Sequence, residues 1–349
     1  TEDIITDLAR FRDLDVIARN STEVYKGKPV DVRQVGRELG VGYVLEGSIQ
    51  REAEQVRIAA QLIEADTGSH VWSDRWDRPA TDVFAVQADL SENVVNRIAG
   101  FGAIDRAKRF EARRKRPEDL DAYETYLLGT EALSLFTAEG AARALRLLED
   151  AVSRDPRLAR AWTAMTWANF QSARGADDPR PFIRDALAAG ERAVEADPSD
   201  AYAHAALGEA LGANGEMQQA ELEYDKALEL NPGSADILTF YSGWAMSFGK
   251  PEAGAEAADR ARRLNPNYPR WAAAGYFAHA YFSVGRYDDT LEVLKRLPAE
   301  SWGRSEFVLE AGSLAMLGRN REAAAVVKRA LAADPELSKE SHSHYGDFR

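Results

Sequence analysis

Apolar and polar residues alternate along residues 55–65, where every second position is apolar: Val56, Ile58, Ala60 and Leu62. This spacing places the four side chains on one face of an extended strand. Two neighbouring runs, residues 43–50 and 69–77, also have the composition of strands. The turn residues 66–68 (Asp-Thr-Gly) are expected to join the last two runs into a hairpin.

Helical spacing flanks these strands. An opening helix over about residues 2–11 carries four apolar side chains on one side: Ile4, Ile5, Leu8 and Phe11. Residues 14–20 (LDVIARN) are predicted to be a strand. A second helix begins with a capping-box-like pair, Asp31 and Gln34, and stops at Gly40. We expect it to bury Val32, Val35 and Leu39.

A third helix is expected from about Thr81, with apolar residues at helical spacing as far as Ile98 and interruptions at Gly100 and Gly102. The predicted order of elements is therefore α-β-α-β-β-β-α, a compact mixed α/β domain.

The rest of the chain repeats one short pattern five times. Each copy has Ala five residues before a Pro, Asp or Asn one residue before it, and a small residue twelve residues before it. The five prolines are Pro156, Pro198, Pro232, Pro266 and Pro335. Internal repetition of this length is typical of stacked helical repeats.

The spacings define the repeating unit. Two successive intervals, Pro198–Pro232 and Pro232–Pro266, are 34 residues long. The last interval of 69 residues has room for two units, and the first, of 42, holds one unit plus about eight residues. We expect that excess in residues 173–181 (ARGADDPRP), between the two helices of one hairpin.

Small residues let two antiparallel helices approach closely, and the Asp or Asn ends the second helix before a Pro that cannot continue it. Four glycines are expected in the tight turns inside hairpins: Gly215, Gly249, Gly285 and Gly318. Gly208 is expected where two helices cross. The segment Leu207–Pro232 carries the pattern almost throughout, and residues 120–336 resemble the tetratricopeptide (TPR) family. The resemblance implies an all-α superhelix of about six hairpins.

A second resemblance covers residues 1 to about 100. The runs Val16–Gln50 and Val56–Arg78 are similar to the TolB-like amino-terminal domain that precedes TPR arrays in bacterial signalling proteins. In those proteins the domain follows a class III adenylate/guanylate cyclase domain or a winged-helix DNA-binding domain. Family members begin this domain with a strand that this chain lacks, and residue 1 is not Met. We therefore expect a piece of a longer polypeptide with an open sheet edge.

The predicted organisation is a multidomain α+β protein. Residues 1–112 form the TolB-like domain, 113–119 a basic linker, 120–336 the TPR array and 337–349 a tail that does not form a polar capping helix.

Charge and composition narrow the function. Residues 1–116 carry 19 Lys and Arg against 20 Asp and Glu, and the remaining residues carry 25 against 37. An acidic array repels phosphate backbones, so nucleic acid is not an expected ligand. The chain has no cysteine, which excludes thiol catalysis and Cys-bound zinc, and no apolar stretch long enough to span a membrane. We expect a cytoplasmic protein without cofactor or metal.

Four features have a functional and a structural interpretation. Residues 72–77 (WSDRWD) concentrate aromatic and charged side chains, which would suit a surface that binds a ligand or partner. The structural interpretation is a strand whose Trp face packs on the helices while its charged residues form ion pairs. Gly40-Val41-Gly42 has the glycine content of a phosphate-binding loop, but such a loop follows a strand and opens a helix. This segment follows a helix and opens a strand, so phosphate binding is not expected there. The basic run 108–116 could bind nucleic acid or a membrane surface. The structural interpretation is a solvated helix end, favoured by the helix dipole, that leads into a linker. No acid or nucleophile is spaced to act with His279 in catalysis, so we expect this histidine to line the groove or to pack in the core.

The TPR resemblance implies that the first helix of each hairpin lines a concave groove. The residues that it places there are Arg160, Thr163, Trp167, Gln171, Tyr202, Glu209, Thr239, Met246, His279 and Phe282. Aromatic and polar groups in a groove suit capture of a peptide or a partner helix, although some of them could pack between neighbouring hairpins instead.

We therefore expect a non-catalytic scaffold or sensor region of a cyclase-like signalling protein, which binds a protein or peptide in its groove. The alternative is the same module on a winged-helix transcription regulator. A free-standing enzyme lacks support, because the sequence shows no triad, phosphate loop or metal cluster. A homodimer is expected from the resemblance, since class III cyclases work as dimers.

Overall fold

The computed structural model describes residues 2–11, 14–25, 27–28, 30–52, 55–79, 91, 93–99, 102–113, 115–116, 119–135, 137–173, 176, 178–266, 268, 272–297 and 302–333. The chain is mostly helical and divides into two compact units, Thr1–Ser234 and Ala235–Arg349. Each unit is described by itself below. The domain boundaries expected from the sequence stay predictions.

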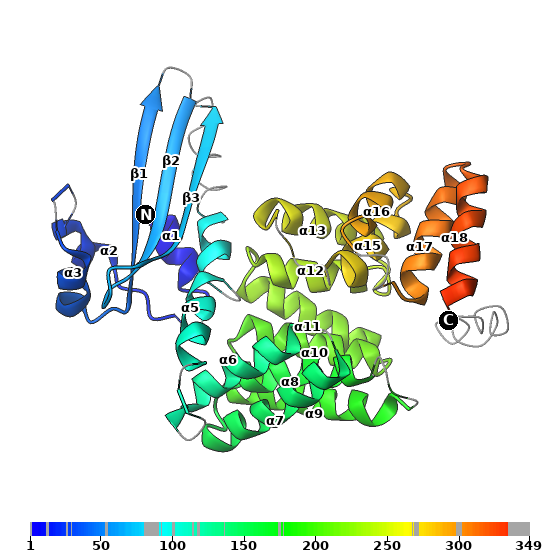
Figure 1. Ribbon diagram of the computed structural model, residues 1–349, viewed down its shortest axis with the longest axis horizontal. Coiled ribbons are helices and arrows are strands. Elements are labelled where there is room, and N and C mark those ends of the chain that lie inside the picture. Colours follow the sequence, from blue (N-terminus) through cyan, green and yellow to red (C-terminus); the bar gives the residue numbers. More distant parts are fainter. Residues whose placement is uncertain are drawn as a thin grey trace. The chain divides into compact units, whose positions relative to one another are not determined.

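The first unit contains a three-stranded antiparallel sheet in the order β1-β2-β3 (Figure 1). Its strands are β1 (Tyr43–Glu52), β2 (Gln55–Glu64) and β3 (His70–Pro79). The predicted alternation is confirmed, because Ile58, Ala60 and Leu62 are buried along the central strand. Gly68 has a positive φ of 73° in the turn between β2 and β3, which confirms the predicted hairpin.

Three short helices precede the sheet: α1 (Glu2–Leu8), α2 (Arg19–Thr22) and α3 (Val32–Leu39). A 3₁₀ turn, Glu23–Tyr25, follows α2. The strand predicted over residues 14–20 is wrong, because residues 14–18 have no regular secondary structure, do not join the sheet, and are followed by α2 from Arg19. An apolar run becomes a strand only when a neighbouring strand takes up its backbone hydrogen bonds, and the sequence cannot show that this partner is missing.

Helix α3 is capped largely as predicted. The Asp31 side chain accepts a hydrogen bond from the Arg33 amide, and Gly40 ends the helix at a positive φ of 67°. The capping box is wrong in its second half, since the Gln34 side chain donates to Glu38 instead of reaching back to Asp31. Val35 is buried, whereas Val32 and Leu39 are half-buried.

Residues 93–98 are helical, and α5 (Ala103–Ala112) follows. Val94 and Ile98 are buried, as the helical spacing predicts. The start of that predicted helix near Thr81 and the interruption at Gly100 lie outside the described residues.

Helical hairpins make up the rest of the described chain. Those of the first unit pair α6 (Ala122–Leu133) with α7 (Ala138–Arg154), α8 (Ala159–Ala173) with α9 (Arg180–Ala196), and α10 (Ala201–Ala213) with α11 (Met217–Leu230). In the second unit α12 (Ala235–Trp244) pairs with α13 (Pro251–Leu264), and α17 (Arg304–Met316) pairs with α18 (Asn320–Ala333). Between these two hairpins, a π-helical turn η3 (Ala273–Phe277) leads into α15 (Ala278–Ser283), which pairs with α16 (Tyr287–Leu294). The 69-residue interval therefore holds two hairpins, as predicted.

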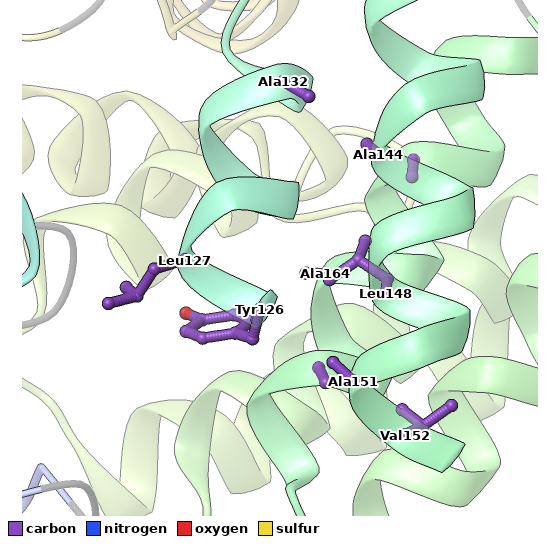
Figure 2. Close-up of a cluster of buried hydrophobic side chains, with 10 residues drawn as sticks. Tyr126, Leu127, Ala132, Ala144, Leu148, Ala151, Val152 and Ala164 are labelled. Carbon is purple, nitrogen blue, oxygen red and sulfur yellow. The ribbon is translucent and has the colours of Figure 1, made fainter. Parts of the chain in front are cut away.

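The repeated small residues lie at the helix contacts. Figure 2 shows Ala144, Leu148 and Ala151 of α7 in the core that α6, α7 and α8 share. The equivalent alanines of the next two hairpins are also fully buried: Ala186, Ala193, Ala220 and Ala227. Larger side chains at these positions would push the helices apart.

Helix ends and turns follow the predicted pattern. The second helices end at the C-cap residues Asp155, Asp197, Asn231 and Asn265, while Asp334 lies outside the described residues. The four turn glycines have φ between 73° and 88°, a conformation that residues with a Cβ rarely adopt. A Cβ on Gly208 would lie 3.0 Å from Cδ2 of Tyr224, which confirms that a small residue is needed where α10 crosses α11.

The eight extra residues of the second hairpin are only partly where the sequence places them. Relative to the α10–α11 hairpin, three of them lengthen the connection between the helices, two lengthen α8 and three lengthen α9. Helix propensity in the flanking segments explains this difference, because an alanine-rich run readily adds residues to a helix.

Candidate functional site

The first helices of neighbouring hairpins contact one another in turn. In the first unit α8 contacts both α6 and α10, and in the second unit α15 contacts both α12 and α17. We call these two sets of helices the first-helix rows. They carry nine of the ten residues that the TPR resemblance assigns to a binding groove, and the tenth, Met246, lies in the turn after α12.

A buried charged cluster lies at the amino-terminal ends of α8 and α10. Arg160 Nε lies 3.5 Å from Asp200 Oδ2, with both side chains less than a tenth exposed. The Arg160 guanidinium carbon is 4.5 Å from the centroid of the Tyr202 ring. Asp200 also caps α10 by accepting from the Tyr202 amide. Removing one partner of a desolvated ion pair leaves an uncompensated buried charge, so Arg160 and Asp200 are expected to hold these two helix ends together.

Phe11 packs on this cluster from the segment that follows α1. Its ring is 3% exposed and its centroid lies 6.4 Å from that of Tyr202. A second contact ties the amino-terminal part to the hairpins, because Asn96 Nδ2 donates to the Gly233 carbonyl at 2.8 Å. Tyr202, predicted from the sequence to line a groove, is therefore covered by an aromatic side chain of the same unit.

The other predicted groove residues of the first unit are partly accessible. Trp167, Gln171 and Glu209 are half-buried, while Thr163 is buried. Gln171 Nε2 donates to the Leu133 carbonyl at the end of α6, and Glu209 accepts from the Tyr224 hydroxyl. Trp167, Gln171 and Glu209 therefore each keep part of their surface accessible on this row.

In the second unit the four predicted residues differ in exposure. Met246 is 51% exposed, whereas Thr239 is buried and bonds to the Ala235 carbonyl of its own helix. Phe282 is half-buried and its ring meets that of Tyr287 edge to face at 5.5 Å. Thr239 is therefore a packing residue, and Met246 presents an apolar side chain to solvent.

His279 is half-buried and its Nε2 lies 2.9 Å from the Ser305 hydroxyl. Burial lowers the pKa of His279 below its ordinary value, against the smaller opposing effect of the Glu306 carboxylate. A neutral imidazole can accept the Ser305 hydroxyl hydrogen, so the pair fixes α15 against α17.

Sequence reasoning missed a second histidine, His204, which is buried in α10. Its Nδ1 lies 2.6 Å from Glu223 Oε2 of α11 and its Nε2 lies 2.9 Å from the Pro198 carbonyl. Burial alone would lower the pKa of His204, but hydrogen bonds to the Glu223 carboxylate and the Pro198 carbonyl raise it above its ordinary value. Two acceptors on one ring favour the doubly protonated imidazolium. Nothing in the alanine-rich sequence around His204 indicates this role.

The other sequence features have structural roles. Within β3, Trp76 is buried, its ring lies 6.0 Å from that of Trp72, and Asp77 pairs with Arg57 across the sheet at 2.7 Å. Gly40 ends α3 and Tyr43 begins β1, so the glycine loop opens a strand as expected.

The basic run is tied to the first hairpin and not merely solvated. Arg113 pairs with Glu131, Lys115 pairs with Glu124, and the Lys108 ammonium lies 4.9 Å from the Tyr123 ring centroid. The carboxylates of α6 therefore already neutralise part of the charge that a phosphate backbone would need.

Within the described residues, no group of three or more His, Cys, Asp or Glu side chains is arranged to hold a metal ion. Over the same residues, every helix is too short or too polar to cross a membrane.

Comparison with known proteins identifies two relatives. The chain is 38% identical over 224 residues to "Putative adenylate cyclase 3" of Rhizobium meliloti (strain 1021), a match that covers 63% of this chain and 38% of that protein. It is 25% identical over 141 residues to the TPR repeat-containing protein YpiA of Bacillus subtilis (strain 168), which covers 40% of this chain and 33% of that protein. The chain thus spans less than half the length of the curated relatives it matches. No family model matches the chain.

Among solved structures, the APC/C hetero-tetramer Cut9–Hcn1 is similar to 72% of this chain and 50% of the matched chain, with a TM-score of 0.51 and 14% identity. This similarity supports a TPR-like fold for the hairpins and carries no information about function.

Proposed function

We propose that this chain is a non-catalytic protein-interaction region that binds a peptide or protein segment along the first-helix rows. The observation that carries the proposal is the packing of Phe11, from the turn that follows α1, against Tyr202 on the first-helix row of the first unit. A face that packs an aromatic anchor of its own chain has the chemistry to pack one from a partner.

The contacts to a partner divide between the units. In the first unit, the half-buried Trp167, Gln171 and Glu209 offer the accessible part of their side chains, and the buried Arg160 and Tyr202 support the same row from within. In the second unit, the exposed Met246, in the turn that follows α12, offers a flexible apolar contact. Phe282 and His279 lie half-buried on α15, and the buried Thr239 packs within the row. Aromatic, Met and Arg side chains are enriched in protein interfaces.

The relatives support a place in signalling. The name of the Rhizobium meliloti protein favours a region of a bacterial adenylate/guanylate cyclase-like protein over the winged-helix alternative, and the identity of 38% supports a shared architecture over the matched residues. In this proposal, residues 1–112 form a TolB-like domain, catalysis belongs to another part of the polypeptide, and the region acts in the cytoplasm, as a homodimer. Partner binding would bias the arrangement of an output domain.

Peptides selected on the immobilised chain from a random library test this function. The proposal predicts that Glu209→Lys weakens ligands selected on the first unit and Met246→Glu weakens those selected on the second, in each case by about tenfold, about 1.4 kcal/mol. Leu222→Glu on α11 is the matched control, because Leu222 is 68% exposed on a second helix. Affinities that fall equally for the control, or for none of the variants, would refute the proposal.

A further inference from the structure

A second surface, separate from the first-helix rows, is hollowed between α7, α8 and α9. This cleft has a volume of about 720 Å³, within the range of ligand sites in proteins. Its floor is apolar and half-buried: Leu145 of α7, Trp162 and Met165 of α8, and Phe182 of α9. Ala188 and Ala189 line the α9 side, where small side chains leave the space open.

The rim of the cleft is acidic. Glu149, Asp185, Glu191 and Glu195 line it together with one cation, Arg192. Arg192 is already paired with Glu195 at 2.7 Å. Across the described part of the chain, Glu149, Asp185 and Glu191 have no ion pair, and all three are exposed. The cleft therefore combines an apolar floor with three carboxylates that lack a counter-charge.

We propose that this cleft docks a basic amphipathic segment of a partner protein, which places a large apolar side chain over Trp162 and Met165 and Lys or Arg side chains against Glu149, Asp185 and Glu191. Charge complementarity selects the cationic partner, and the apolar floor selects a segment with a hydrophobic face. The exposed rim favours a docked peptide over an enclosed small molecule, because small-molecule sites bury most of their ligand.

The site is independent of the proposed function. Its lining residues come from two second helices and from α8 positions other than Arg160, Trp167 and Gln171. The chain could therefore hold one partner on the first-helix row and another in this cleft.

Binding of a fluorescein-labelled 14-residue Leu–Lys amphipathic peptide, followed by anisotropy at physiological salt, tests the proposal. We expect saturable binding to the wild-type chain, and binding at least about tenfold weaker for Asp185→Lys and for Ala188→Trp. Asp185→Lys reverses one rim charge, whereas Ala188→Trp fills the cleft from an exposed position without removing a packed side chain. Circular dichroism checks that both variants remain folded.

Three controls separate docking from general attraction to an acidic protein. Glu256→Lys changes the net charge as Asp185→Lys does, from an exposed position on α13, and should leave the affinity unchanged. A Leu–Glu peptide and an all-Lys peptide of the same length should both bind at least about tenfold more weakly. An equal loss with Glu256→Lys, equal binding of the all-Lys peptide, or full binding by folded Ala188→Trp would overturn the proposal.

Discussion

The Phe11 ring lies 6.4 Å from the Tyr202 ring, measured between centroids, although the two residues belong to the first segment and the third hairpin of the same unit. Phe11→Ala should therefore destabilise the first unit by about 3 kcal/mol, the usual cost of deleting a buried aromatic ring. Urea unfolding followed by circular dichroism measures this cost. Hydrogen exchange should quicken at the start of α10.

The control for that variant is Val24→Ala. Val24 is 57% exposed, so its truncation should change stability by less than about 0.5 kcal/mol. If Phe11→Ala behaved like Val24→Ala, the ring contact would have no energetic role and the observation behind the proposed function would fail.

Gly208→Ala should destabilise the α10–α11 hairpin by about 1–3 kcal/mol. The new Cβ would lie 3.0 Å from Tyr224 Cδ2 and 3.2 Å from the Ala220 carbonyl oxygen, so one helix must shift. Gly275→Ala is the contrasting substitution, because a Cβ there meets nothing within 4 Å. Thermal unfolding of the two variants should show a lowered Tm for the first alone, and equal Tm values would contradict this packing.

His204 predicts a pH dependence of stability. Its pKa is raised in the folded state, so its ion pair with Glu223 stabilises the fold fully below the unfolded-state pKa of about 6.5 and is lost as pH rises through the higher folded-state pKa. The unfolding free energies of the wild type and Glu223→Gln should therefore differ more at about pH 6 than at about pH 9.

His70→Gln is the control for this titration, since His70 is exposed on β3. Its pH profile of stability should run parallel to that of the wild type. A constant difference between Glu223→Gln and wild type across the same pH range would show that His204 remains neutral in the fold.

Tyr281→Phe should cost the second unit about 1–2 kcal/mol. The Tyr281 hydroxyl accepts from Arg262 and donates to Asp259, while the ring is fully buried, so removal leaves both partners short of a bond. Tyr287→Phe, half-buried on the neighbouring α16, is the matched control. Chemical denaturation of both variants measures the difference, and equal stability would show that the hydroxyl is dispensable.

The repeat fold was predictable because its determinants are local. Ala220, Ala227 and Asn231 occupy positions fixed by the geometry of two packed helices, and each hairpin repeats them. The strand predicted over residues 14–20 failed for the opposite reason, since a strand needs a neighbouring strand and none in the described sheet pairs with this segment. Gln34 likewise had two partners within reach, the Asp31 amide as a donor and the Glu38 carboxylate as an acceptor, and only the folded structure shows that it bonds to Glu38.

The candidate site was harder to predict because it depends on contacts between distant segments. The pattern placed Arg160 and Tyr202 on first helices, but nothing in the sequence around Phe11 shows that its ring packs against Tyr202. The pair of His204 with Glu223 and the cleft over Trp162 also arise only when neighbouring helices pack. Periodicity shows which residues share a helix face, but not which distant side chains meet there.

The most direct test of partner binding is a hydrogen-exchange footprint of a library-selected peptide bound to the chain. The account predicts slower exchange along α8 and α10 or along α12 and α15, with no change in α11 and α13, and loss of the footprint in Glu209→Lys or Met246→Glu. Protection confined to the second helices, or a footprint that survives both substitutions, would contradict binding along the first-helix rows.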